Sequence, residues 1–308
     1  MVSAGKASLK YKFDFTKEKE KNMSSKVYFT REITPENVLR LYRLLGIDLE
    51  GKVAVKLHSG ETGNQNFLRP EFFKPAIDAV NGTVVECNTA YDGTRNTTEA
   101  HWRTMEEHGW SKYYNVDIMD EDGEIALPIV GGTHLTENFV GDHFNNYDSM
   151  LILSHFKGHP MGGFGGALKN ISIGIASSHG KAHIHGVGDP EKIWTADHDS
   201  FLECMAEAAK SIMDAMNGRI AFVNVMKNMS VDCDCCSVAE DPKIGDIGIL
   251  ASLDPVAIDK ACVDLVYASD DPGKADLIKR MESRNGIHTV DVAAKLGVGS
   301  IDYELIEV

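Results

Sequence analysis

The sequence lacks an excess of basic residues, a long apolar run and a secretory signal. Its 308 residues include 31 Lys and Arg against 46 Asp and Glu, which gives a formal net charge of −15 at pH 7. A chain this acidic has no basic surplus to neutralise phosphates, so we expect no general nucleic-acid binding. No apolar run approaches the roughly 20 residues that span a bilayer, and no signal-peptide core is present. We therefore expect a cytoplasmic protein that does not associate with membranes.

Residues 1–25 form a charged segment that differs from the rest of the chain. The Lys- and Glu-rich run at residues 17–22 directly precedes Met23. Codons for Lys and Glu are purine-rich, as ribosome-binding sites are, so one interpretation is a translated leader with the native start at Met23. The other is a disordered tail, which its charge favours equally.

From residue 26 onward the chain predicts a single α/β domain that ends at residue 308. Short apolar runs alternate with amphipathic segments, and 43% of the residues are hydrophobic, enough for a sizeable core. Such alternation predicts a mostly parallel sheet covered by helices on both faces, in three layers. The clearest predicted strands are residues 52–58, 83–87, 150–153 and 219–225, and strands are also expected at 126–130, 247–251 and 303–308.

Polar and titratable residues follow three of the predicted strands at the point where each strand ends. Because the carboxyl ends of parallel strands meet at one edge of a sheet, we expect these residues to form one pocket with Lys169. We assign binding of a small anion to Lys56, Asn88, Arg95 and Lys169. We assign catalysis to His58, Glu61 and Lys157, with His58 or Glu61 moving protons.

A glycine-rich turn separates the strand at 150–153 from a helix predicted to start at Ala167. Glycines let backbone N–H groups approach a ligand, and a helix N-terminus favours negative charge. Gly163, Gly165 and Gly166 are therefore candidate contacts for the anion. The alternative is a tight turn that packs the helix against the sheet, because the spacing matches neither the phosphate-loop motif nor the dinucleotide fingerprint.

The six cysteines are unevenly distributed. Three lie singly within apolar patterns, whereas Cys233, Cys235 and Cys236 lie within four positions. In an extended segment Cys233 and Cys235 would point to one face and Cys236 away from it. Together with His155 and His159, Cys233 and Cys235 predict a tetrahedral site for zinc, iron or nickel. A redox pair of thiols or a structural loop is the alternative.

The order and wording of several motifs resemble those of a known family. The motifs are KLHSGE (56–61), SHFKGH (154–159), GGFGGALKN (162–170), HGK (179–181), DCDC (232–235) and DPVAID (254–259). From about residue 26 to 265 the chain resembles the uncharacterised iron–sulfur-centre proteins, domain-of-unknown-function family 362. Many relatives carry a ferredoxin-like insertion after the HGK motif at 179–181, where this chain has no cysteine before Cys204. The resemblance therefore makes an iron–sulfur cluster the less favoured cofactor, and it supplies no reaction.

Two functions remain open on the sequence. The first is a metal-dependent enzyme that acts on a small anionic molecule. The second is a non-catalytic protein that holds a metal ion or an iron–sulfur cluster and serves a redox partner. The two functions predict different metal contents, and the residues alone do not choose between them.

Overall fold

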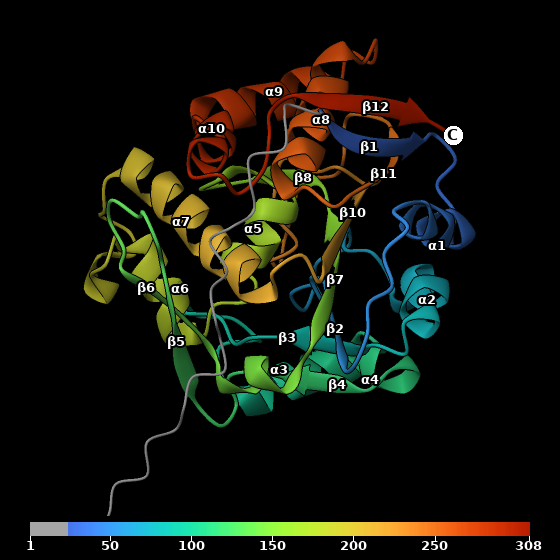
Figure 1. Ribbon diagram of the computed structural model, residues 1–308. Coiled ribbons are helices and arrows are strands. Elements are labelled where there is room, and N and C mark those ends of the chain that lie inside the picture. The colour runs from blue at the N-terminus through green and yellow to red at the C-terminus, as the bar shows by residue number, and fades with distance from the viewer. Residues whose placement is uncertain (1–23) are drawn as a thin grey trace, which may run out of the picture.

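The computed structural model describes residues 24–308, and the two interpretations of residues 1–23 lie outside the described residues. Its centre is an eight-stranded sheet with the order β12-β1-β11-β10-β7-β2-β3-β4 (Figure 1). The strands are β1 (Ser25–Thr30), β2 (Val53–Lys56), β3 (Thr83–Glu86), β4 (Val116–Ile118), β7 (Ser149–His155), β10 (Ile220–Met226), β11 (Gly248–Ser252) and β12 (Tyr303–Glu307). Because β1 begins at Ser25, the folded unit includes the last residue of the predicted leader.

The sheet is mostly parallel, as predicted. β10, β7, β2, β3 and β4 pair in parallel, and β1 pairs with β12 in parallel. β11 runs opposite to both of its neighbours, β1 and β10. The carboxyl ends of β2, β3, β7 and β10 therefore reach the same edge of the sheet, where parallel sheets bind their ligands.

Helices cover both faces of the sheet and give the predicted three-layer α/β architecture. In Figure 1, α1 and α2 lie on one side of the central strands and α5 and α7 on the other. The helices are α1 (Pro35–Leu44), α2 (Pro70–Ala79), α3 (Thr98–Glu107), α4 (Trp110–Tyr113), α5 (Ala167–Ser172), α6 (Ser178–His185), α7 (His198–Met216), α8 (Pro255–Ala268), α9 (Lys274–Ser283) and α10 (Ile287–Lys295), with 3-10 turns η1 (Asp142–Asn146) and η2 (Pro190–Lys192).

The strand β7 shows how one sequence supplies two hydrophobic cores. Its Met150 and Ile152 pack into the core under α5, α7 and α8, while Leu151 and Leu153 pack into the core under α1 and α2. Successive side chains of a strand point to opposite faces, so a continuous apolar run is what a strand covered on both sides requires. This run of four apolar residues is why the strand could be located from sequence.

Two small sheets lie outside the main one. β5 (Glu124–Pro128) pairs with β6 (Glu137–Gly141), and β8 (Lys157–His159) pairs with β9 (Gly163–Gly165), both antiparallel. The strand predicted at 126–130 thus belongs to a separate hairpin and not to the central sheet. Its exposure alternates along β5, as expected for a hairpin with one face in water.

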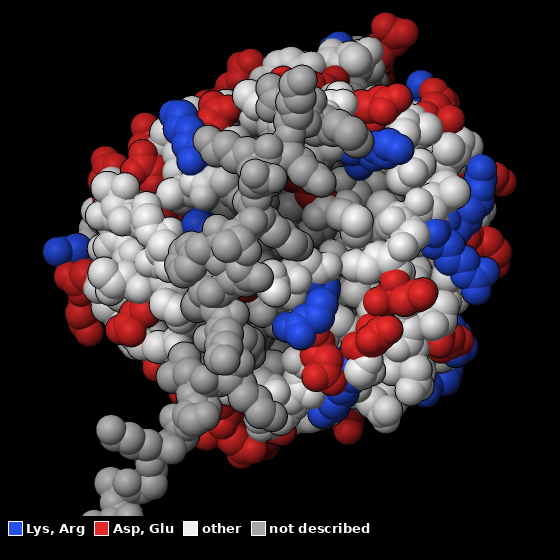
Figure 2. Space-filling view, in the orientation of Figure 1, with Lys and Arg blue, Asp and Glu red and all other residues white. Residues whose placement is uncertain are grey.

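The acidic character of the chain is visible on its surface. On the face shown in Figure 2, Asp and Glu side chains are interspersed with Lys and Arg around the rim. Within residues 24–308, none of the helices combines the length and the apolar character that crossing a bilayer requires.

Candidate functional site

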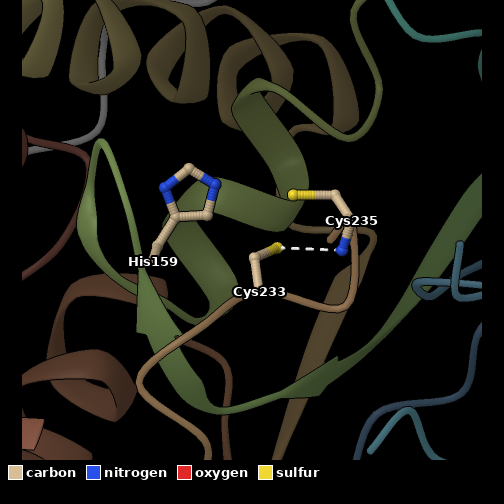
Figure 3. A group of neighbouring side chains, drawn as sticks. All are labelled: His159, Cys233 and Cys235. Atoms are coloured by element: carbon tan, nitrogen blue, oxygen red, sulfur yellow. Dashed lines mark hydrogen bonds between the residues drawn. The ribbon is translucent and has the colours of Figure 1, made fainter. Parts of the chain in front are cut away.

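Three potential metal ligands meet beyond the carboxyl ends of β7 and β10. One donor atom each from His159, Cys233 and Cys235 lies within 4.8 Å of the other two. Figure 3 shows the His159 ring and the two sulfur atoms facing one another, although about 75 residues separate the histidine from the cysteines. The structure therefore brings together three of the four residues that we assign to the metal from sequence.

The orientation of His159 is fixed by its own loop. Its Nδ1 accepts hydrogen bonds from the backbone N–H groups of Met161, at 3.1 Å, and Gly162, at 2.9 Å. Because Nδ1 is used as an acceptor, Nε2 is the nitrogen left for the thiols and the one that carries the proton of a neutral ring. Burial, followed by Lys169, lowers the pKa of His159 to about 4, so the ring is neutral at pH 7.

The two cysteines are adjacent through a turn and not through an extended segment. The Cys236 N–H donates to the Cys233 carbonyl at 3.0 Å, and the Cys235 N–H donates to the Cys233 sulfur at 3.4 Å. We expected an extended segment to direct both sulfurs to one face. Both sulfurs do lie near His159, but a turn places them there and not an extended segment. N–H donation to a sulfur stabilises its thiolate form, which is the form that binds metals.

His155 anchors this turn and is not part of the donor group. Its Nδ1 lies 2.9 Å from the carboxylate of Asp234, and its Nε2 lies 2.6 Å from the backbone carbonyl of Lys227. Both ring nitrogens therefore already have hydrogen-bond partners within the protein. The structure thus corrects our assignment of His155 as a ligand: the residue holds Asp234, which lies between the two cysteines.

Asp234 is the residue that fixes the position of the cysteine turn. It is buried, and it also pairs with Lys157 Nζ at 2.8 Å. Burial opposes ionisation of Asp234, but His155 and Lys157 outweigh it and hold the pKa of the carboxyl group well below its usual range. The side chain of Lys157 is therefore committed to an ion pair, which makes it a structural cation of the site.

A second contact holds the turn from the side of β2. The Asn64 amide nitrogen donates to the carbonyls of Cys236, at 2.8 Å, and Cys233, at 3.3 Å. The next two side-chain amides continue the contact, Gln65 to the carbonyl of Ala239 and Asn66 to that of Glu240. Buried backbone carbonyls need such donors, so the segment after β2 and the cysteine segment form one unit.

A small cavity of about 50 Å³ adjoins the donor group. A water occupies roughly 10–15 Å³ on this measure, so the cavity holds a few waters or one very small ligand. Of the residues assigned to the site from sequence, those that line it are Lys56, His58, Arg95, His155, Lys157, Gly165, Gly166, Lys169, Cys233 and Cys235. Glu61, Asn88, Gly163 and His159 are not among the lining residues.

The residues that do not line the cavity have identifiable structural partners. Asn88 donates to Thr98 Oγ1 at 2.9 Å and contacts His101, both in α3. Glu61 accepts from Arg95 Nε at 3.0 Å and from Thr94. The structure thus orients Asn88 toward α3 instead of the cavity, and it places Glu61 behind Arg95.

A chain of buried ion pairs supports one wall of the cavity. Lys56 Nζ lies 2.6 Å from Glu86, and Arg95 lies 3.9 Å from the other oxygen of the same carboxylate. Burial raises the pKa of Glu86, but Lys56, His58 and Arg95 outweigh that effect and hold the carboxylate ionised. Lys56 and Arg95 therefore neutralise protein carboxylates before any ligand enters.

Lys169 differs from these cations. It lies in the short helix α5, lines the cavity and is half-buried. Within residues 24–308, no ion pair or hydrogen bond joins its side chain to another residue. Lys169 is thus the positive charge of the cavity wall that remains available to a ligand.

The glycine-rich turn has a different role from the one predicted. The carboxylate of Asp259 accepts hydrogen bonds from the Ala167 N–H, at 2.7 Å, and the Leu168 N–H, at 2.9 Å. It fills the helix N-terminus where we expected an anion, and a Cβ at position 166 would overlap it. Gly163 has φ +77° and packs against Gly286, so the tight-turn alternative describes Gly163 and Gly166.

The sequence of the chain matches one family model over most of its length. The family model described as Domain of unknown function (DUF362) matches residues 53–264. The chain belongs to the DUF362 family. No curated protein matches it.

Two solved structures are similar to this DUF362 chain. The lactate racemase apoprotein from Thermoanaerobacterium thermosaccharolyticum has a TM-score of 0.43 and 12% identity, over 91% of this chain and 82% of that chain. A Thermotoga maritima protein from a structural genomics consortium has a TM-score of 0.42 and 11% identity, over 85% of this chain and 59% of that chain.

Three residues of the DUF362 domain that the structure places at the site, Asp234, Asn64 and Lys181, had no role predicted from sequence. Asp234 had a usable signal, because a residue between two cysteines that share a site must point elsewhere and needs its own partner. Asn64 lies in a polar loop that resembles any solvated loop. Lys181 belongs to the HGK motif, but its burial depends on tertiary packing and could not be predicted from sequence.

A second group of potential ligands lies at the far edge of the sheet. Donor atoms of Asp117, Glu121 and His143 lie within 4.8 Å of one another. His143, however, contacts Asp117 through Nδ1 at 2.8 Å and Asp122 through Nε2 at 3.0 Å. Hydrogen bonds to these carboxylates raise the pKa of His143 to about 9, so the ring acts as a cation within this group.

Proposed function

We propose that this DUF362 protein is a metal-dependent enzyme that acts on a small anionic molecule. The observation that carries the proposal is the convergence of His159, Cys233 and Cys235, because both cysteines line a cavity that Lys169 also lines. A metal site and an available positive charge in one small cavity are what binding and activating an anion requires.

The donor set fits a soft or borderline divalent cation. Two thiolates and one imidazole suit zinc, iron or nickel, and three protein ligands leave a coordination position open for a substrate. Such a cation would supply Lewis-acid polarisation of an anionic ligand. Because the two thiols must ionise to bind the cation, metal uptake is expected to release protons.

Lys169 is the proposed anion contact. Lys56, Arg95 and Lys157 are already paired with Glu86, Glu61 and Asp234. Removing the charge of Lys169 therefore changes ligand affinity without unpairing a buried carboxylate. The cavity volume of about 50 Å³ favours an anion of a few heavy atoms.

His58 is the proposed proton-transfer residue. Its Nδ1 accepts from the Gly60 N–H at 3.1 Å, so Nε2 carries the proton of the neutral ring. Burial, followed by Arg95, lowers the pKa of His58 to about 4, and its contact with Cys233 opposes that shift. A neutral histidine beside Cys233 can donate its N–H as a hydrogen bond to a ligand, which polarises the ligand for proton transfer. Glu61 is tied to Arg95 and Thr94, which leaves His58 as the better candidate of the two.

Metal analysis of anaerobically purified protein tests the proposal. We expect close to one equivalent of zinc, nickel or iron in the wild type and its loss in Cys235→Ser. Cys236→Ser is the matched control, because this neighbouring cysteine lies outside the donor group. Equal metal content in both variants, or no metal in the wild type after metal supplementation, would overturn the site.

The second candidate is a cluster-binding protein that serves a redox partner. It is favoured by the third thiol, because Cys236 lies close enough to Cys235 to alter its pKa. Iron with acid-labile sulfide and a visible absorption band would support this function. One equivalent of metal without sulfide, together with weakening of phosphate or acetate binding by Lys169→Met, would support the enzyme.

A further inference from the structure

Lys181 is a buried amine that no carboxylate neutralises in the described part of the chain. It lies in α6 and its Nζ donates to the backbone carbonyls of Ala176, at 2.5 Å, and Cys87, at 3.4 Å. The other two fully buried lysines of the site, Lys56 and Lys157, each have a carboxylate within 2.8 Å. Lys181 therefore contacts neutral backbone carbonyls, whereas Lys56 and Lys157 contact ionised carboxylates.

The number of acceptors matches a neutral amine. An ammonium group has three N–H donors and no lone pair, whereas a neutral amine has two N–H donors and one lone pair. Two carbonyls accept from Lys181, which satisfies both N–H groups of the neutral form and leaves the lone pair free. A charged form would bury a third N–H without a partner in residues 24–308, which costs free energy.

The charged surroundings of Lys181 act in both directions. Burial lowers the pKa of Lys181, and the positive charge of Lys56 adds to this, while Asp120 and Glu86 oppose it. The net shift is downward. Desolvation and a neighbouring cation are the two conditions that turn a lysine into a nucleophile.

Lys181 also lines the same cavity as Lys169. The lining of this cavity of about 50 Å³ therefore includes both an amine and a positive charge. A ligand that uses both needs an electrophilic carbon and a negative group within a few bonds of each other. A 2-oxo acid has a carbonyl carbon directly attached to a carboxylate.

We propose that Lys181 forms an imine with a small 2-oxo acid whose carboxylate contacts Lys169. The amine lone pair attacks the carbonyl carbon and forms the C–N bond. The carbonyl oxygen then leaves as water with both amine protons, and a C=N bond remains. The reaction consumes no oxidant or reductant and needs no metal, so it can be tested apart from the metal site, although both use Lys169 and the same cavity.

Borohydride trapping on the metal-free, full-length protein tests this inference. The probe is glyoxylate, the smallest 2-oxo acid, and borohydride reduces an imine to a stable carboxymethyl-lysine. We expect peptide mass spectrometry to find the adduct at Lys181 with at least ten times the occupancy at Lys210, a surface lysine paired with Asp214. Equal labelling of both lysines, or labelling concentrated at Lys169 or Lys56, would overturn the proposal.

Variants sharpen the same measurement. Lys181→Arg keeps a long side chain that can donate to the same carbonyls but cannot form the imine, so trapped adduct should fall to the background of Lys210, while Lys210→Arg should leave labelling at Lys181 unchanged. Circular dichroism checks that each variant folds. If Lys181→Arg does not fold, the position of the adduct in the wild type still decides, and glycolate, which has no aldehyde or ketone group, must give no adduct. Metal content is measured on the same preparation, so failure of the imine and failure of the metal site are read separately.

Discussion

Two loops border the cavity, and they use their polar groups in opposite ways. The glycine-rich turn before α5 directs its N–H groups at Asp259, a buried side chain of α8. The cysteine turn at residues 233–236 directs its backbone at Asn64 and the side chain of Asp234 at His155 and Lys157, which leaves two sulfurs facing the cavity. The first loop is satisfied by the protein itself, and the second is fixed in place with its donor atoms still available.

The comparison shows that a loop is a binding site only when its donors lack an internal partner. Both loops have the composition of a ligand site, and both follow a buried strand or precede a helix. A single carboxylate, Asp259, converts the anion position of one loop into part of the core. The same kind of residue, Asp234, positions the other loop because it points away from the sulfurs.

Removing the charge of Asp234 should have the largest effect. In Asp234→Asn, Lys157 loses its carboxylate while it remains buried, which should lower the free energy of unfolding by about 4 kcal/mol. The cysteine turn also loses its anchor, so metal affinity should fall by about 10–100-fold. Urea denaturation and competition with a metal chelator measure the two effects.

Asp232→Asn is the matched control for this variant. Asp232 lies on the other side of Cys233 and makes a partly exposed contact with Arg280 at 3.4 Å. Its loss should cost less than about 1 kcal/mol, as for other exposed pairs. Comparable losses in the two variants would mean that the ion pair with Lys157 does not hold the turn.

The titration of Asp259 should have the next largest effect. Burial raises the pKa of Asp259 from 3.8 to about 6, against the N–H groups of Leu168 and Ala167 and the Asn224 amide, which lower it. A carboxyl group with a raised pKa contributes stability that is fully present below pH 3.8 and is lost as the pH rises through about 6. The contribution lost over this range is about 3 kcal/mol.

Asp259→Asn isolates that contribution, because an amide does not titrate. The difference in the free energy of unfolding between wild type and variant should change by that amount between pH 3.8 and 6 and stay constant above pH 7. A difference that does not depend on pH would show that folding does not raise the pKa of Asp259. Asp214→Asn, on the exposed face of α7, is expected to shift stability by only a few tenths of a kcal/mol.

Strands with uninterrupted apolar runs and helices with clear caps could be predicted from sequence, because these signals are local. Met150 to Leu153 marks β7, and Thr34 caps α1 through the Asn37 N–H. The parallel order then follows from alternation, and it brings the strand ends to one edge. The short hairpin β8–β9 and the helices α6 and α10 were not predicted, because their pairing and burial depend on residues distant in sequence.

The candidate site was only partly predictable for the same reason. The identity of Cys233, Cys235 and His159 as potential ligands follows from residue type and position at strand ends. The choice between His155 and His159 does not, because it depends on which of the two rings faces Asp234. Likewise, Gly166 was predicted to contact an anion and Lys181 had no predicted role, because neither the contact of Gly166 with Asp259 nor that of Lys181 with Cys87 can be seen in the sequence.

The smallest expected effect comes from the clamp at Asn64. Asn64→Asp keeps the oxygen that accepts from the Asn66 and Phe67 N–H groups but removes the donor to the carbonyls of Cys233 and Cys236. Loss of these hydrogen bonds should cost about 1–2 kcal/mol of stability. The turn then loosens around the sulfurs, so cobalt(II), used as a probe, should bind less tightly and show a weaker thiolate charge-transfer band.

The control is Asn66→Asp, two residues further along the loop. It removes the same kind of side-chain donor, here the one to the carbonyl of Glu240. Its stability cost should be similar, because the same kind of hydrogen bond is lost. Its cobalt affinity should match the wild type, because Glu240 lies four residues beyond the cysteine turn. A residue that positions the sulfurs should change cobalt affinity as well as stability, whereas a residue that only packs the loop should change stability alone. Equal cobalt affinity in Asn64→Asp and Asn66→Asp would therefore show that Asn64 does not position the sulfurs.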